Sequence, residues 1–193
     1  LFPAFSIEES LELKGGPLYG DDNLFADYHL QKGEQDIDSV FSGSHRIIED
    51  EICTGFQEHV YMEPQGMVGS LENDKYVITA SCQCPFYMRK AVAGVLAVDL
   101  DDIVVRQAVT GGAFGGKEHF PDVIAGPLVV AVQVIKKPIQ ILFDRKEDIS
   151  FTSKRHPSRI RFRTALDSNN KIIGMDIDIA INAGAYQSCS HIV

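Results

Sequence analysis

The sequence lacks several features that would indicate particular classes of protein. It has no run of about eighteen apolar residues, the length typical of a membrane-spanning helix. Its first residues carry no basic segment followed by an apolar one, so we expect no signal peptide and a cytoplasmic location. Lys and Arg number 18 against 27 Asp and Glu, which gives a formal net charge of −9. Because nucleic-acid binding requires excess positive charge, we expect no nucleic-acid partner. Because a long apolar run is lacking, we also expect no membrane partner.

Cysteine is scarce as well, with four residues at positions 53, 82, 84 and 189. Without a secretory signal, we expect reduced thiols rather than disulfides. Cys82 and Cys84 would point the same way on a strand, which is how a metal site could begin. No second pair at the spacing of a zinc site follows, however. We therefore expect both to be small buried hydrophobic residues.

The remaining composition is that of an ordinary globular protein. The 193 residues are 45% hydrophobic and 23% charged, with no internal repeat and no low-complexity tract. This length suffices for one sizeable domain with an additional arm. The chain does not begin with Met, and it ends soon after a strand-like run, so we expect it to be part of a longer polypeptide.

Strand and helix patterns are mixed along the chain. Helices are expected at residues 6–13, 33–41, 85–99 and 119–137, and strands at 44–56, 75–82, 101–109 and 138–144. Pro127 should kink or split the fourth helix, because proline cannot donate the helical hydrogen bond. Residues 145–157 are expected to form a polar connection.

The last segment predicts an antiparallel hairpin. Apolar residues alternate with Arg159, Arg161 and Arg163 in the first run, and with Asp residues in the run 172–181. The sequence DSNN between the two runs has the composition of a turn. The basic run 154–163 is then the charged face of a strand. Together with the helices, this predicts an α+β fold with mixed and antiparallel sheets.

The segment VTGGAFGGKEHF, residues 109–120, is unusually rich in glycine. Gly111, Gly116 and Lys117 match a phosphate-binding loop, but Glu118 occupies the position where that loop needs Ser or Thr. The dinucleotide-binding pattern is absent too. Two interpretations remain: a turn that needs positive φ, or a loop whose free N–H groups line an anionic or oxo ligand.

The octapeptide GGAFGGKE resembles the loop, commonly GGGFGGKE, of the xanthine dehydrogenase and aldehyde oxidase family of molybdenum hydroxylases. The spacing from Gln83 to Phe114, 114 − 83 = 31 residues, fits the pattern of that family. Other segments follow in the order of the family: QEHVYMEPQ (57–65), SCQC (81–84), FDRKED (143–148), RHP (155–157) and NAGAY (182–186). The resemblance implies that residues 25–193 belong to a first molybdenum-cofactor-binding domain, incomplete at its carboxyl end. Residues 1–24 would be the arm that joins it to a preceding small domain.

The resemblance also implies the cofactor and the partners. A molybdenum ion would be held by the dithiolene of molybdopterin, and iron–sulfur clusters and FAD on other modules would carry electrons onward. The partners would be the remaining molybdenum domain of the same subunit, the iron–sulfur and flavin modules, and a small-molecule substrate, in an oligomeric enzyme. The substrate would be a purine, another N-heterocycle or an aldehyde.

Individual residues acquire expected roles from the same resemblance. The side-chain amide of Gln83 would donate a hydrogen bond to a metal-bound oxygen without adding charge. Phe114 and Gly115 would place main chain beside the metal ligands, and Gly112 would lie near the pterin. Gln83 and Phe114 would thus be near molybdenum without being strong direct ligands. Glu118 resembles the carboxylate that faces the substrate in purine-hydroxylating members.

The resemblance further implies that the chain alone is inactive. No catalytic residue is expected within it, because the general-base glutamate of the family would lie beyond Val193. Ala113 replaces a glycine of the family loop, which would matter if its φ were positive. Lys117 is expected to be solvated, and His59 to be a packing residue with satisfied hydrogen bonds. A phosphate-loop nucleotide-binding protein and a non-catalytic assembly module remain as alternatives.

Overall fold

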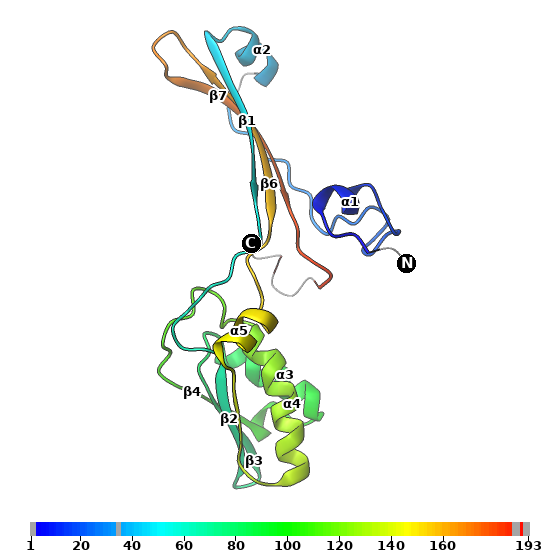
Figure 1. Cartoon of the computed structure of the whole chain (residues 1–193), viewed down its shortest axis with the longest axis vertical. Helices are drawn as coiled ribbons and strands as arrows, with labels where there is room; N and C mark the ends of the chain where they lie inside the picture. Colours follow the sequence, from blue (N-terminus) through cyan, green and yellow to red (C-terminus); the bar gives the residue numbers. More distant parts are fainter. Residues whose placement is uncertain (1–2, 34–35, 187–189, 191–193) are drawn as a thin grey trace. The chain divides into compact units, whose positions relative to one another are not determined.

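The computed structural model describes residues 3–33, 36–186 and 190. The chain divides into two compact units (Figure 1). We call Leu1–Phe56 with His156–Val193 the terminal unit, and Gln57–Arg155 the central unit.

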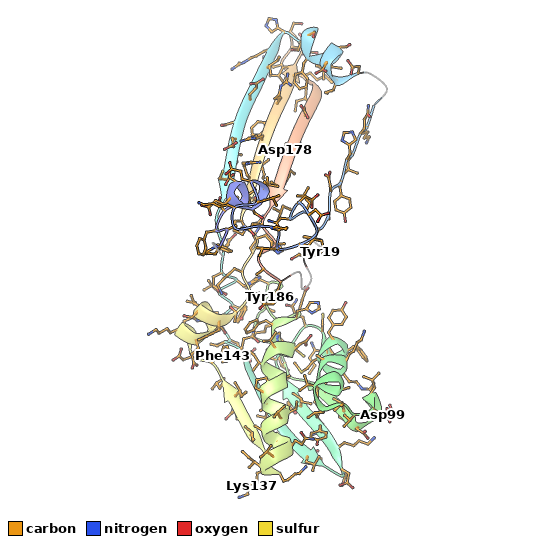
Figure 2. All side chains as sticks on the ribbon, turned by 90° about the vertical axis from the view of Figure 1, so that its right-hand side faces the viewer. Tyr19, Asp99, Lys137, Phe143, Asp178 and Tyr186 are labelled. Carbon is orange, nitrogen blue, oxygen red and sulfur yellow. The ribbon has the colours of Figure 1, made fainter. Side chains whose placement is uncertain are left out.

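The terminal unit is built on a three-stranded antiparallel sheet with the order β1-β6-β7 (Figure 2). Its elements are α1 (Ile7–Leu11), α2 (Ile37–Ser42), β1 (Arg46–Thr54), β6 (Ser158–Leu166) and β7 (Ile172–Ile181). Both short helices begin at side-chain caps: Ser6 accepts a hydrogen bond from the N–H of Glu9, and Asp36 from that of Ser39. The predicted hairpin of β6 and β7 is confirmed. The strand expected at residues 44–56 and the helices expected at 6–13 and 33–41 are confirmed as well.

The two faces of this sheet differ in character. The register places Glu49 opposite Arg163 and Glu51 opposite Arg161 on one face, and both pairs form ion pairs. The register places Asp176 and Asp178 of β7 across from the same two arginines, and Figure 2 labels Asp178 on this sheet. The opposite face is apolar, and within the described part of the chain its side chains are exposed at Ile48, Ile52, Met175, Ile177, Ile179 and Ile181. The basic run is therefore the charged face of a strand, as the alternation predicts.

The central unit combines a mixed four-stranded sheet, in the order β4-β3-β2-β5, with three helices. Its strands are β2 (Gly66–Glu72), β3 (Lys75–Ala80), β4 (Ile103–Gln107) and β5 (Ile139–Leu142). Its helices are α3 (Pro85–Leu96), α4 (Phe120–Ile135) and α5 (Arg145–Phe151), with a 3₁₀ turn η1 at Leu100–Asp102. Strands β3 and β4 are parallel and the other neighbours antiparallel. The predicted α+β class with mixed and antiparallel sheets is confirmed.

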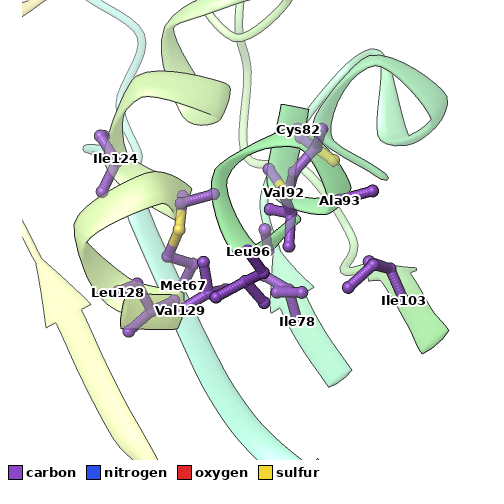
Figure 3. Packing of buried hydrophobic residues seen from close by; sticks show 13 residues of the cluster. Met67, Ile78, Cys82, Val92, Ala93, Leu96, Ile103, Ile124, Leu128 and Val129 are labelled. Atoms are coloured by element: carbon purple, nitrogen blue, oxygen red, sulfur yellow. The ribbon is translucent and has the colours of Figure 1, made fainter. Parts of the chain in front are cut away.

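The hydrophobic core of the central unit lies between α3, α4 and the sheet (Figure 3). The side chains of Ile78, Val92 and Leu128 in this core have no exposed surface. A Cβ added at Gly69 of β2 would lie 3.0 Å from Cγ of Leu128, so strand and helix approach as closely as a glycine allows. This packing holds the ends of β3 and β4, from which the segments described below emerge.

Helix α4 continues through Pro127, so the expected split is wrong, whereas the kink stays a prediction. The carbonyl that proline leaves without a partner is that of Val123, one turn earlier. Val123 and Pro127 are both exposed, so water can bind this carbonyl. The buried residues Leu128 and Val129 meanwhile hold the following turn against the core.

Helix α5 corrects a second prediction, since residues 145–157 were expected to be a polar connection. Asp144 and Glu147 form a capping box: Oδ1 of Asp144 accepts from the N–H of Glu147 at 2.8 Å, and Oε2 of Glu147 accepts from the N–H of Asp144 at 2.9 Å. The sequence DRKE carries the spacing of this motif. The prediction was wrong because it followed the charged composition of residues 145–148 and not the capping motif.

The cysteines only partly follow expectation. Cys82 is buried, but Cys84 is half-buried and Cys53 is exposed, while Cys189 lies outside the described residues. Among residues 3–33, 36–186 and 190, no three His, Cys, Asp or Glu side chains gather as a metal site would need. None of the helices in the described ranges has the length and apolar character that crossing a bilayer requires.

Candidate functional site

The glycine-rich segment 111–117 is a loop between β4 and α4 whose backbone takes unusual dihedral angles. The φ angles are +96° at Gly112, +52° at Phe114 and +91° at Gly115. Glycine adopts this region freely, but a phenylalanine there is uncommon. Ala113 is not among the residues with positive φ. The methyl group of Ala113 therefore causes no backbone strain, which corrects the concern raised by its departure from the family pattern.

The other two glycines allow close approach between the loop and residues 59–63. A Cβ at Gly111 would lie 2.8 Å from Cβ of Glu63, and one at Gly116 would lie 2.7 Å from Cε1 of Tyr61. The main chain is also tied down at both positions. The N–H of Gly111 donates to Oε2 of Glu63 at 2.8 Å, and the carbonyl of Gly116 accepts from Nε2 of Gln65 at 3.0 Å. The two ends of the loop are thus anchored.

Between these anchors, the tip of the loop remains open. The N–H groups of residues 112–115 donate to no acceptor within the described part of the chain. The side chain of Phe114 is 79% exposed. Consecutive unpaired N–H groups near positive-φ residues form a concavity that suits an anion or a metal-bound oxygen.

Gln83, which directly precedes the N-cap residue of α3, contacts the end of this loop. Its Oε1 accepts from the N–H of Lys117 at 3.1 Å, and its own N–H donates to the carbonyl of Lys117 at 2.7 Å. Nε2 of Gln83 consequently points its two N–H donors elsewhere and has no acceptor among the described residues. The structure therefore brings Gln83 to the loop with an available donor.

Glu118 follows the loop and is half-buried. Its N–H donates to the carbonyl of Gly115 at 3.4 Å, a weak contact that continues the turn. Its carboxylate forms no hydrogen bond or ion pair with the described residues, so it is available to a ligand.

Lys117 was expected to be solvated, and this prediction is wrong. Its side chain has no exposed surface. Nζ donates to Oε2 of Glu63 at 2.9 Å and to Oγ of Ser81 at 3.0 Å, and lies 4.6 Å from the ring centre of Tyr61. The lysine of a phosphate loop must reach the phosphates. A lysine buried in an ion pair cannot do so, which argues against that alternative.

Glu63 carries the negative charge that makes this burial possible. Burial raises the pKa of Glu63, but the hydrogen bonds from Ser81, Lys117 and the Gly111 N–H, together with the charge of Lys117, outweigh it and lower the pKa to about 2. Glu63 is therefore ionised at physiological pH, and the buried ammonium group always has its counter-charge.

A second buried network connects the loop to α5. Nε2 of Gln65 also donates to the Tyr61 hydroxyl at 2.7 Å, and the N–H of Gln65 donates to Oδ2 of Asp148 at 2.7 Å. Burial and the hydrogen bond with Asp148 raise the pKa of Tyr61, so its hydroxyl keeps its proton. Arg145 of α5 donates to the carbonyl of Tyr61 at 2.6 Å. Helix α5 thereby supports residues 61–65, on which the loop rests.

Two titratable groups beside the loop are incompletely paired. His59 packs against the ring of Tyr61, as expected of a packing residue, but its buried Nδ1 has no hydrogen bond among the described residues and lies 4.0 Å from Oε1 of Glu58. A Cβ at Gly115 would lie 3.9 Å from Nε2 of His59. In the first turn of α4, burial raises the pKa of Asp122 to about 7, and its Oδ2 lies 3.7 Å from Nδ1 of His119.

The sequence reasoning thus named the loop and Gln83 but missed the side chains beneath them. The missed residues are Tyr61, Glu63, Gln65, Ser81, Lys117 and Asp148. The signal that could have found the central pair is a lysine inside a glycine-rich loop, together with a glutamate in QEHVYMEPQ. Glycines admit neighbouring side chains, and a buried cation needs a carboxylate.

These features define an α+β domain with an anchored loop that suits an oxygen-rich or anionic ligand. A family model, the molybdopterin cofactor-binding domain, matches residues 19–193. The crystal structure of the aldehyde oxidoreductase from Desulfovibrio desulfuricans aligns with 94% of this chain and 20% of its own, with a TM-score of 0.81 and 26% identity. This chain is therefore a member of the molybdopterin cofactor-binding domain family of the molybdenum hydroxylases.

Curated relatives agree with this assignment. The large molybdopterin subunit of nicotinate dehydrogenase from Eubacterium barkeri is 30% identical over 185 residues, which are 95% of this chain and 43% of that protein. Xanthine dehydrogenase from Calliphora vicina is 31% identical over 180 residues, 93% of this chain and 13% of that protein. The chain thus spans less than half the length of each of these relatives.

Proposed function

We propose that this chain forms one wall of the molybdenum site in an enzyme that hydroxylates a purine, another N-heterocycle or an aldehyde with oxygen derived from water. One observation supports it most: the open N–H groups of residues 112–115 lie on an anchored loop that Gln83 contacts with its amide donor free. The named relatives act on nicotinate, xanthine or aldehydes, which sets the range of substrates.

The residues present fit the molybdenum cofactor. Gln83 would donate a hydrogen bond from Nε2 to a metal-bound oxygen, and the main chain at Phe114 and Gly115 would lie against the metal ligands. Gly112, with its φ of +96°, would leave room for the pterin. When bound, the cofactor supplies the oxygen-transfer chemistry and accepts the two electrons released by the substrate. These side chains would orient it, and Phe114 would limit access of water.

Glu118 would act on the substrate. Its unpaired carboxylate would accept a hydrogen bond from the N–H edge of a heterocycle, or donate one when protonated, and so stabilise charge as the ring is attacked. This favours an N-heterocycle over a simple aldehyde. The general base, the second molybdenum domain, and the iron–sulfur and flavin modules would be supplied by other parts of the enzyme.

The test uses Gln83→Ala and Glu118→Ala in the complete enzyme, with Gln133→Ala, an exposed glutamine of α4, as the matched control. We expect Gln83→Ala to lower kcat on the order of 100-fold, or to lower the molybdenum content, because one preorganised donor is lost. Glu118→Ala should reduce kcat/KM for a heterocycle more than for an aldehyde. Gln133→Ala should match the wild type.

An unchanged kcat and molybdenum content in both variants would remove the site assignment. The same result would support a non-catalytic assembly role for this part of the chain.

A further inference from the structure

A single oxygen atom joins the two ends of the glycine loop. Oε2 of Glu63 accepts hydrogen bonds from the N–H of Gly111 at 2.8 Å and from Nζ of Lys117 at 2.9 Å. Gly111 begins the loop and Lys117 ends it. Because both donors converge on one atom, the separation of the two ends of the loop depends on the position of the Glu63 carboxylate.

The same oxygen also reaches the end of β3. It accepts a hydrogen bond from Oγ of Ser81 at 2.6 Å, and Ser81 in turn accepts one from Nζ of Lys117 at 3.0 Å. Ser81 lies two residues before Gln83. The carboxylate therefore ties the loop to the strand that carries Gln83, and the orientation of one depends on the other.

Lys117 links the Glu63 carboxylate to Gln83. While its ammonium group is held by Glu63 and Ser81, its N–H and carbonyl both bond to Gln83, at 3.1 Å and 2.7 Å. Its side chain is fully buried, so it has no alternative partner in water. Movement of Lys117 would consequently move Gln83 as well.

We infer that Glu63 and Lys117 are positioning residues, which close the base of the glycine loop and thereby set the distance between the Gln83 amide and the open N–H groups of residues 112–115. The inference rests on the proposed function for the identity of the ligand that this distance serves. Oε2 of Glu63 and Nζ of Lys117 are occupied by one another and by Ser81 and Gly111, so these two atoms hold the loop and are not offered to the ligand.

The main experiment compares Glu63→Gln and Glu63→Ala in the complete enzyme. Gln keeps an acceptor for Ser81 and Gly111 but loses the charge that pairs with Lys117, whereas Ala loses both. We expect kcat to fall about 10- to 100-fold in Glu63→Gln with little change in KM, and further in Glu63→Ala. The partial rescue by Gln distinguishes a held geometry from general destabilisation.

Two readouts do not depend on turnover. The line shape of the molybdenum(V) electron paramagnetic resonance signal should change in Glu63→Gln, because the amide of Gln83 is displaced. Hydrogen exchange of the hydrogen-bonded amides of Gly111, Gly116 and Lys117 should accelerate, because the base of the loop opens. Exchange is measurable in Glu63→Gln even if Glu63→Ala accumulates poorly.

The matched control is Glu72→Gln, which breaks the ion pair with Arg106 elsewhere in the central unit. That pair has the same N–O distance of 2.9 Å, but its cation, Arg106, is 55% exposed, whereas Lys117 is fully buried. It should leave kcat, the spectrum and loop exchange unchanged. Lys117→Met should reproduce the faster exchange of Glu63→Gln, and the double variant should show less than the summed effect, because the two residues act through one contact.

The outcomes separate this inference from the proposed function. If Gln83→Ala alters the molybdenum spectrum while Glu63→Gln leaves both the spectrum and loop exchange as in the wild type, the positioning role is wrong and the proposed function stands. If Gln83→Ala has no effect on spectrum or metal content but Glu63→Gln accelerates loop exchange, the closure of the loop is supported and the molybdenum role of Gln83 is wrong.

Discussion

The two units of the chain differ in how far their charged and apolar side chains are exposed to solvent. In the terminal unit, β1 is exposed along its whole length, and its charged residues pair with neighbours across an open sheet face. In the central unit, Val77, Ile78 and Ala80 of β3 are buried under helices, and the charge of Lys117 is buried with them. Exposed charges tolerate loss of a partner because water replaces it, whereas a buried charge does not. The glycine loop thus belongs to the unit in which burial fixes the positions of charged side chains.

The largest expected difference concerns apolar packing. Leu128→Ala removes a side chain with no exposed surface from the central core and should lower the free energy of unfolding of that unit by about 4 kcal/mol. Ile179→Ala, at a residue 55% exposed on β7, should cost less than about 1 kcal/mol. Urea denaturation of the chain, monitored by hydrogen exchange in each unit, measures both. A comparable loss at Ile179 would show that the apolar sheet face is buried in solution.

A smaller difference should appear in the dependence of stability on pH. Burial raises the pKa of Asp122 to about 7, above the value of about 3.9 expected when unfolded. The folded state then binds more protons than the unfolded state between these two values. The contribution of Asp122 to the free energy of unfolding is therefore largest below about pH 4, and it is lost as pH rises to about 7. A shift of about three units, at about 1.4 kcal/mol for each unit, sets an upper bound of about 4 kcal/mol on this loss, which relaxation around the carboxylate reduces.

Asp122→Asn should abolish this slope in denaturation curves recorded from pH 4 to 8. Asp176→Asn, in the exposed charged face of the terminal unit, serves as the control and should leave the slope in place. Adding His119→Gln to both backgrounds isolates any contribution of the imidazole 3.7 Å away. Persistence of the slope in Asp122→Asn would assign it to another group.

The smallest effect is expected in the charged ladder of the terminal unit. Arg161→Gln removes the ion pair with Glu51, whose side chain is also largely exposed. The denaturation midpoint should hardly move, and 1 M NaCl should erase any change, because salt screens exposed charges. Lys117→Gln in the central unit should lower the midpoint at both salt concentrations. A strong, salt-resistant effect of Arg161→Gln would contradict the contrast between the units.

Much of the fold follows from local patterns. The alternation around Arg159, Arg161 and Arg163 predicted β6 and its charged face, and Pro85 marked the first turn of α3. Helix α5 was missed although Asp144 and Glu147 carried a capping signal. For the fourth helix, the local rule for Pro127 predicted a kink or a split, and with Leu128 and Val129 buried the helix is not split.

The sequence by itself determined that a glycine-rich loop precedes α4, and the octapeptide in this loop indicated a family of molybdenum enzymes. Periodicity and motif composition are local, so they can be recognised without coordinates. Only the tertiary structure decided that Lys117 is buried, that Glu63 receives it, and that both meet the strand end leading to Gln83. Those contacts join residues separated by up to 54 positions in the chain, and only the folded backbone brings them within hydrogen-bonding distance.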